Sequence, residues 1–120
     1  MKRIFILVLT VLGSLALNAQ EAAKVNLVQT PGEFQQKELK LEAGKSYYFE
    51  VENNGVDRLV GFVIAPKGKT DKQYHIKDAY LYSTIADGEI SRSNELTLEK
   101  GEYVYFCPLN PTPQYTLIVE

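Results

Sequence analysis

The stretch KGEYVYFCPLNPTPQY, residues 100–115, decides the fold of this 120-residue chain. Residues 103–107 place tyrosine, tyrosine and cysteine on one face and apolar residues on the other, which is the period of a β-strand. Three prolines follow Cys107, the single cysteine of the chain, and each proline fixes a backbone φ angle. The stretch therefore predicts a strand that ends at Cys107, a stiff loop, and a closing strand over residues 115–119.

The rest of the chain consists of short alternating segments that are separated by turn residues. Expected strands share this alternation or a short apolar run, and lie at residues 24–30, 38–42, 46–53, 59–65, 78–85 and 94–99. The nearly apolar stretch 59–65 predicts a central strand that is covered on both faces, and Gly61 within it indicates close approach of another backbone or a bulge. Residues 66–77 are polar and lysine-rich, and we expect them to form a surface excursion. Such a pattern, without helical periodicity, predicts one all-β sandwich or barrel.

The first segment has the composition of a secretory signal peptide. Two basic residues precede an apolar run, residues 4–17, which is shorter than the roughly 20 residues that span a bilayer. Cleavage after Ala19 would remove residues 1–19 and leave residues 20–120 as one domain. We then expect a periplasmic or extracellular protein without a stable membrane anchor. The alternative is that the segment is not cleaved and anchors the chain in the membrane.

Charge and cysteine content narrow the classes of partner. Removing Lys2 and Arg3 from the 13 basic residues leaves 11 against 15 acidic residues, a net charge of −4 for residues 20–120. A mildly acidic chain without a basic cluster argues against binding to nucleic acid or to anionic membranes. One cysteine cannot form a disulfide within the chain, so it is buried, bound to a metal, or linked to another molecule in a Cys107-linked dimer.

Four segments resemble the cupredoxin family, the small Greek-key β-sandwiches that hold blue copper. They are LKLEAGKSYYFEVEN, NNGVDRLVGFVI, LTLEKGEYVYFCP and PTPQYTLIVE, and together they cover roughly residues 38–65 and 95–120. The third segment resembles the penultimate strand that delivers the ligand cysteine of the family. The resemblance implies a cupredoxin-like Greek-key β-sandwich of seven to eight strands for residues 20–120.

The same resemblance implies a copper site whose ligands this chain largely lacks. A type 1 site needs two imidazoles and one thiolate, with a weak axial ligand. The histidines would fall at or beside Arg58 and near Gln114, but His75 is the single histidine of the chain. A type 1 site within one chain is therefore excluded by the residue count. The remaining metal candidates are Cys107, Gln114 and His75, with copper held as Cu(I) or shared between two chains.

Neither Cys107 nor His75 carries a local signature of catalysis. A thiol catalyst would need a base and an orienting acid within reach of the cysteine, and the sequence around both residues indicates neither. We expect an inert, half-buried thiol and a solvated loop histidine. No catalytic residue is assigned, and the chain is not expected to be an enzyme.

The corner where the copper ligands would lie offers a candidate binding surface instead. Its residues come from the two loops that flank the missing ligands: Asn54, Asp57, Arg58, Asn110 and Gln114. We expect Arg58 to replace the metal as the pin between these loops, through an acidic partner or loop carbonyls. The prolines stiffen the second loop and indicate a preformed surface.

The sequence thus predicts an exported cupredoxin-like binding or accessory module without a cofactor, whose partner is a protein or a small ligand. One alternative is copper binding or electron transfer through Cys107, in a non-standard or intersubunit site. A second alternative is a different β-sandwich, such as an immunoglobulin-like adhesion or carbohydrate module.

Overall fold

A computed structural model describes residues 21–120, so the expected signal peptide at residues 1–19 lies outside the described residues. The described part of the chain contains nine strands in two sheets. The first sheet has the order β2-β1-β4-β6, and β7 also pairs with β4. Its members are β1 (Ala23–Thr30), β2 (Glu33–Phe34), β4 (Ser46–Asn53), β6 (Ile90–Arg92) and β7 (Leu96–Thr97). Within residues 21–120 no helix has the length and apolar character needed to cross a membrane.

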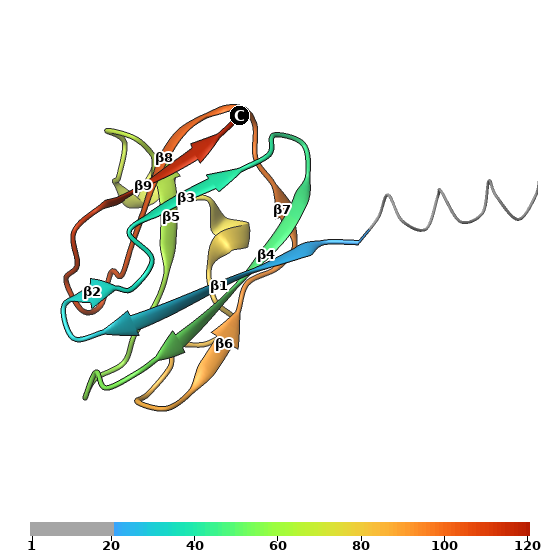
Figure 1. The fold of residues 1–120 in the computed structure, drawn as a ribbon. Helices are drawn as coiled ribbons and strands as arrows, with labels where there is room; N and C mark the ends of the chain where they lie inside the picture. Colours follow the sequence, from blue (N-terminus) through green and yellow to red (C-terminus); the bar gives the residue numbers. More distant parts are fainter. Residues whose placement is uncertain (1–20) are drawn as a thin grey trace, which may run out of the picture.

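The second sheet has the order β3-β9-β8-β5 and faces the first as the other half of a sandwich (Figure 1). Its members are β3 (Glu38–Leu41), β5 (Val63–Pro66), β8 (Gly101–Phe106) and β9 (Tyr115–Val119). Parallel pairing joins β1 to β4 and β3 to β9, and the other pairs are antiparallel. The all-β sandwich is confirmed. Nine strands occur in residues 21–120 where seven or eight were expected, because β2 and β6 were not predicted, while the strand expected at residues 78–85 does not form.

The main core lies between the sheets and follows the predicted alternation. Tyr47, Phe49, Val51 and Asn53 of β4 are buried, while the residues between them are half-buried. Tyr105 and Cys107 from the end of β8 join the same core. Burial of apolar side chains from both sheets is the main stabilising contribution in a domain without a disulfide.

The strand expected at residues 59–65 is shorter than predicted, although its burial is as expected. Regular pairing covers only β5, and Val60 forms an isolated bridge with Ile85. The nearest atoms to a β-carbon built at Gly61 are side-chain carbons of Pro108 and Leu109, at 3.5 and 3.6 Å. They make an ordinary side-chain packing contact and not the close approach of another backbone, and they place the loop after Cys107 against the loop before β5.

The prediction of a strand at residues 78–85 is wrong. A short 3-10 helix, η2 (Lys77–Ala79), begins this segment, and isolated bridges at Leu81 and Ile85 follow it. Only single positions meet a neighbouring strand, so no continuous ladder forms. The strand β6, which pairs with β4, was not predicted.

The lysine-rich excursion predicted at residues 66–77 extends to Tyr80 and folds back over the outer face of the second sheet. It contains η1 (Lys72–Tyr74) and η2, and the amide of Ile76 donates to the carbonyl of Ile64 at 2.8 Å. Val63, Ala65 and Val104 form a second, smaller cluster there, against which Tyr80 and Phe106 pack. The strand β5 is thus covered on both faces, as predicted, but the prediction that it is central is wrong, because β5 lies at the edge of the second sheet.

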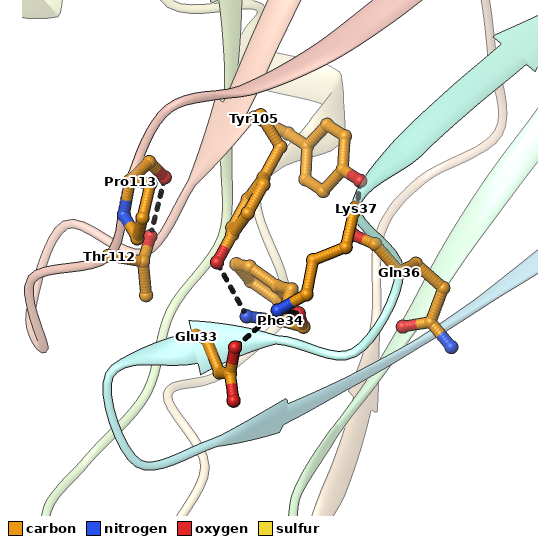
Figure 2. A network of polar contacts seen from close by, with 8 residues as sticks. Glu33, Phe34, Gln36, Lys37, Tyr105, Thr112 and Pro113 are labelled. Atoms are coloured by element: carbon orange, nitrogen blue, oxygen red, sulfur yellow. Dashed lines mark hydrogen bonds and ion pairs between the residues drawn. The ribbon is translucent and has the colours of Figure 1, made fainter.

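A polar network ties the segment 33–37 to the second sheet. Figure 2 shows the hydroxyl of Tyr105 directed at this segment, where it donates to the carbonyl of Gln36. The amide of Phe34 donates to the hydroxyl of Tyr115 at 3.2 Å, and Lys37 pairs with Glu33. Burial, with a smaller contribution from the neighbouring Tyr115, raises the pKa of Tyr105 to about 12. The tyrosines of β8 and β9 therefore act as packing and anchoring residues.

Candidate functional site

Cys107 lies directly after β8, where two loops meet: residues 54–61 and 107–114, called here the loop corner. Its side chain is 3% exposed and belongs to the main core. The sulfur accepts hydrogen bonds from the backbone amides of Gly61 at 3.4 Å and Asn110 at 3.3 Å. The amide of Cys107 itself donates to the hydroxyl of Thr112 at 3.2 Å. The thiol is therefore a buried core group that is already contacted by the backbones of both loops.

A single buried amide, that of Asn53, holds the first of these loops. Its Nδ2 donates to the carbonyls of Val56 at 3.1 Å, Arg58 at 3.1 Å and Ile85 at 3.2 Å. Its Oδ1 accepts from the amide of Val56 at 2.9 Å. Asn53 thus satisfies backbone groups that the turn would otherwise bury without partners. The sequence predicts Asn53 only as the last residue of the strand 46–53, because its hydrogen-bond partners become neighbours only in the folded chain.

Arg58 does not act as the expected pin. Its side chain is exposed, and it forms no ion pair within the described part of the chain. Only its backbone carbonyl takes part, as an acceptor from Asn53. The side chain instead lines a shallow hollow with Asp57, Leu59 and Asp87. A guanidinium loses solvation when it is buried, and the exposed position of Arg58 beside Asp57 and Asp87 keeps its charge in water.

The two positions that face the sulfur differ from those expected for the missing histidines. Gly61, three residues beyond Arg58, contacts the sulfur from the first loop, and Asn110 contacts it from the second. Gln114 is exposed just before β9 and makes no hydrogen bond within residues 21–120. The turn that begins at Pro108 returns the chain to Cys107 after three residues, so Gln114 lies beyond the part of the loop that contacts the sulfur.

The ring of His75 is fixed by hydrogen bonds, whereas a solvated loop histidine was expected. Its Nε2 lies 2.9 Å from the carbonyl of Thr70 and therefore donates to it, which leaves Nδ1 to accept from the hydroxyl of Tyr80 at 2.7 Å. The ring also packs edge-on against Tyr80 and Phe106, with centroids 5.9 and 6.1 Å away. Both ring nitrogens are thus occupied by the excursion's own groups.

The chain's thiol and its imidazole lie on opposite faces of the second sheet. Successive residues of an extended strand point to opposite sides, and His75 packs on Phe106 in the outer cluster while Cys107 points into the main core. Across residues 21–120 no group of three or more histidine, cysteine, aspartate or glutamate side chains is arranged to hold a metal ion. The donors around Cys107 therefore do not fit a type 1 copper site, which requires two imidazoles beside the thiolate.

An apolar hollow of about 280 Å³ opens beside Cys107. Its lining includes Gly61, Tyr80, Leu81, Pro108 and Leu109, so it lies between the loop corner and the end of the excursion. Leu109 is 46% exposed at its rim. In the sequence, this surface corresponds to CPLNP, a leucine between prolines. That motif predicts a stiff loop and does not by itself indicate an apolar hollow.

None of the predicted surface residues lines this hollow. Asn54, Asp57 and Gln114 are exposed, and Asn110 is half-buried with an Nδ2 that has no hydrogen-bond partner among residues 21–120. The amide of Gly55 donates to the carboxylate of Asp87, which directs the 54–58 turn towards the turn before β6. The structure therefore joins Gly61 to residues 107–110 and places the 54–58 turn beside Asp87.

A second buried amide lies in register with Asn53. Gln29 of β1 pairs with Asn53 across the parallel β1–β4 ladder, and its side chain is completely buried. Both polar atoms of this side chain are without a partner in the described part of the chain. No pattern in the sequence pointed to this residue, because a glutamine at a strand end reads as a surface residue.

Comparisons with known proteins agree with this fold. The model of the family described as "Cupredoxin-like domain" matches residues 2–119, and no curated protein matches the chain. Auracyanin A, a "blue" copper protein from Chloroflexus aurantiacus, is 18% identical with a TM-score of 0.63, over 83% of this chain and 100% of its own.

Two further solved structures have the same fold. An azurin from Methylomonas sp. strain J is 14% identical with a TM-score of 0.64, over 83% of this chain and 99% of its own. Amicyanin from Paracoccus versutus is 19% identical with a TM-score of 0.51, over 84% and 83%. The alternative prediction of a different β-sandwich, such as an immunoglobulin-like module, is therefore wrong. The chain belongs to the family of cupredoxin-like domains.

Proposed function

We propose that this chain is an exported cupredoxin-like binding or accessory module that works without a bound metal. The observation that carries the proposal is the setting of the one thiol and the one imidazole that the chain could offer to copper. The Cys107 sulfur is buried against amides of Gly61 and Asn110, and both nitrogens of His75 are bound on the other face of β8. Asn53 holds the first loop in the absence of a metal, so the corner is a preformed surface.

The surface that the partner would use is apolar and lies at the loop corner. Leu59 and Leu109 are 49% and 46% exposed, and burying these apolar side chains against a partner would be favourable. Leu109 stands at the rim of the hollow beside Cys107 and is flanked by prolines that limit the entropy lost on binding. These features favour a partner with an apolar contact surface. Export rests on the signal-like segment 1–19, which places the module in the periplasm or outside the cell.

Site-specific photo-crosslinking in the source cells tests the proposed surface. A photo-reactive residue at position 109 should give a discrete adduct with one partner. The matched control is position 90, because Ile90 is 56% exposed but lies on β6 of the first sheet. Adducts from both positions, or from neither, would contradict a partner surface at the loop corner.

Copper binding through Cys107 in a non-standard or intersubunit site is the second candidate. The observation in its favour is that the cysteine of the family's strand end is retained beside two loops. Its 3% exposure means that donors from another chain could reach the sulfur only after residues 107–114 open. In its intersubunit form this candidate predicts a dimer that dissociates on chelation or, if the chains are linked through Cys107, on reduction, and in its single-chain form it predicts a Cys107-dependent copper complex of the monomer. A monomer that binds no copper through Cys107 would contradict both forms.

A further inference from the structure

We propose that Asn54 is a site of spontaneous deamidation and that Asp87 restrains the reaction. Asn54–Gly55 is the single Asn–Gly pair in the sequence, and Asn54 is exposed immediately after β4. Glycine is the residue that least hinders attack by its own backbone nitrogen on the preceding side chain, because it has no β-carbon. This proposal does not depend on whether the loop corner binds a partner or a metal.

The reaction is redox-neutral and needs only water. The backbone nitrogen of Gly55 attacks Cγ of Asn54, a new C–N bond forms, and the bond from Cγ to Nδ2 breaks. Ammonia leaves and takes up the proton that the Gly55 amide has lost, which gives a cyclic succinimide. Water then adds to either carbonyl of the ring and opens it to aspartate or isoaspartate at position 54.

The surroundings of Gly55 leave room for this ring. Its φ angle is +96°, and a β-carbon built there would meet only the Cδ of Pro31, at 3.8 Å. The other asparagines of the described chain are followed by residues that hinder the attack or prevent it. Leucine, asparagine and glutamate follow three of them, and Pro111, which has no amide proton to lose, follows Asn110.

Asp87 is placed to slow the first step. Its Oδ1 accepts a hydrogen bond of 2.8 Å from the Gly55 amide, the group that must lose its proton and turn towards Cγ. The carboxylate holds that proton, and its negative charge opposes the formation of an amide anion beside it. The amide of Asn54 also donates to the carbonyl of Gln29 at 2.8 Å, which fixes the backbone on the other side.

Deamidation would change the corner in two ways. It would place a new carboxylate near those of Asp87 and Asp57, where like charges repel. Isoaspartate would also insert a methylene group into the backbone at position 54, next to the hydrogen bond with Gln29 at the end of the β1–β4 ladder. Modified molecules should therefore be more acidic and have a looser 54–58 turn.

Ageing of the purified protein in a mildly alkaline buffer tests the proposal. Tandem mass spectrometry and isoaspartate detection would follow position 54 in the wild type and in Asp87→Ala, Asp57→Ala and Asn54→Gln. Alanine is used at position 87 because asparagine before Gly88 would create a second Asn–Gly pair. Asp57→Ala is the matched control, since it removes a nearby exposed charge that makes no hydrogen bond to Gly55. A peptide of residues 52–58 gives the unrestrained rate.

The proposal expects slow deamidation at position 54 in the wild type, below the peptide rate. Asp87→Ala should accelerate it several-fold towards the peptide rate, Asp57→Ala should leave it near the wild-type rate, and Asn54→Gln should abolish it. A wild type that stays intact after the peptide has fully reacted would overturn the modification site. If the Asp87→Ala variant deamidates at the wild-type rate or more slowly, the proposed restraint by Asp87 would be overturned. A slower rate would show that Asp87 instead accepts a proton in the reaction.

Discussion

The loop corner contains Cys107, the only thiol of this chain, and the excursion contains His75, its only imidazole. The two side chains lie in different surroundings, on opposite faces of the second sheet. Cys107 points into the main core, and two backbone amides from neighbouring loops contact its sulfur. His75 lies over the outer cluster and bridges Thr70 and Tyr80 within its own excursion. Strand β8 separates the two groups. Each donor serves local structure, and the fold does not bring them together.

This difference shows that a cysteine at the expected strand end does not by itself create a copper site. In this chain the first loop is held by the amide of Asn53, whose partners are carbonyls and an amide of the backbone. The excursion is held by His75 and by apolar packing. The two regions have separate supports, so a substitution that loosens one of them should leave the other intact.

Asn53→Ala should have the largest effect, because it leaves buried carbonyls of Val56 and Ile85 without this donor. We expect a loss of about 3 kcal/mol in the free energy of unfolding, measured by chemical denaturation. Under native conditions Cys107 should react faster with a thiol reagent, whereas the ring signals of His75 in NMR spectra should stay unchanged.

Asn54→Ala is the matched control, because the Asn54 side chain is exposed and makes no hydrogen bond within residues 21–120. It should change stability by no more than about 0.5 kcal/mol. Equal losses in the two variants would show that the amide of Asn53 does not hold the corner.

His75→Ala should have the next largest effect. It removes the contacts with Thr70 and Tyr80 and the packing on Phe106, so we expect a loss of about 2 kcal/mol. Hydrogen exchange should rise in the excursion, while the thiol reactivity of Cys107 should not change. Gln73→Ala, at an exposed position of η1, is the control. A rise in thiol reactivity with His75→Ala would show that the two regions are coupled.

Gln29→Met should raise the free energy of unfolding, whereas Asn53→Ala, at the position that pairs with Gln29, should lower it. Its completely buried amide has no partner among residues 21–120, and methionine of similar length removes the cost of burying both polar atoms. A gain of about 1 kcal/mol is expected in chemical denaturation. Gln35→Met, at an exposed position, should be neutral. A loss of stability in Gln29→Met would instead reveal that the amide binds an internal water or another group.

Tyr105→Phe should have the smallest effect at neutral pH, a loss of about 1 kcal/mol from the missing hydrogen bond to Gln36. Its signature is the pH dependence. Burial raises the pKa of Tyr105 from 10.0 to about 12, so between these values the folded state keeps a proton that the unfolded state has lost. Stability should therefore fall as the pH rises through this window. Thermal unfolding should show a shallower fall in the variant, and identical slopes would contradict a buried hydroxyl.

The elements that the sequence predicts well are those with strong alternation. The inward faces of β4 and β8, the turn at Pro31–Gly32 and the strand that ends at Cys107 all follow from apolar periodicity and turn residues. Segment 78–85 was predicted wrongly because its alternating tyrosines pack on the outer cluster, at Tyr80, or remain exposed, at Tyr82. Packing partners, which the pattern does not contain, decided its structure.

The candidate site could be predicted only in part. The absence of the histidines follows from composition, but the positions that face the sulfur depend on how the loops bend. Gly61 and Asn110 occupy them, while Arg58 and Gln114 were expected. The role of Asn53 was also missed, since one of its acceptors lies 32 residues away along the chain.

A copper titration of the purified protein in both oxidation states tests the central claim most directly, with Cys107→Ser and His75→Gln measured in parallel. The account predicts no stoichiometric complex that requires Cys107, no intense visible thiolate-to-copper charge-transfer band, and the same weak residual binding in all three proteins. A one-to-one complex with such a band, lost in Cys107→Ser, would contradict the account and make the chain a copper carrier.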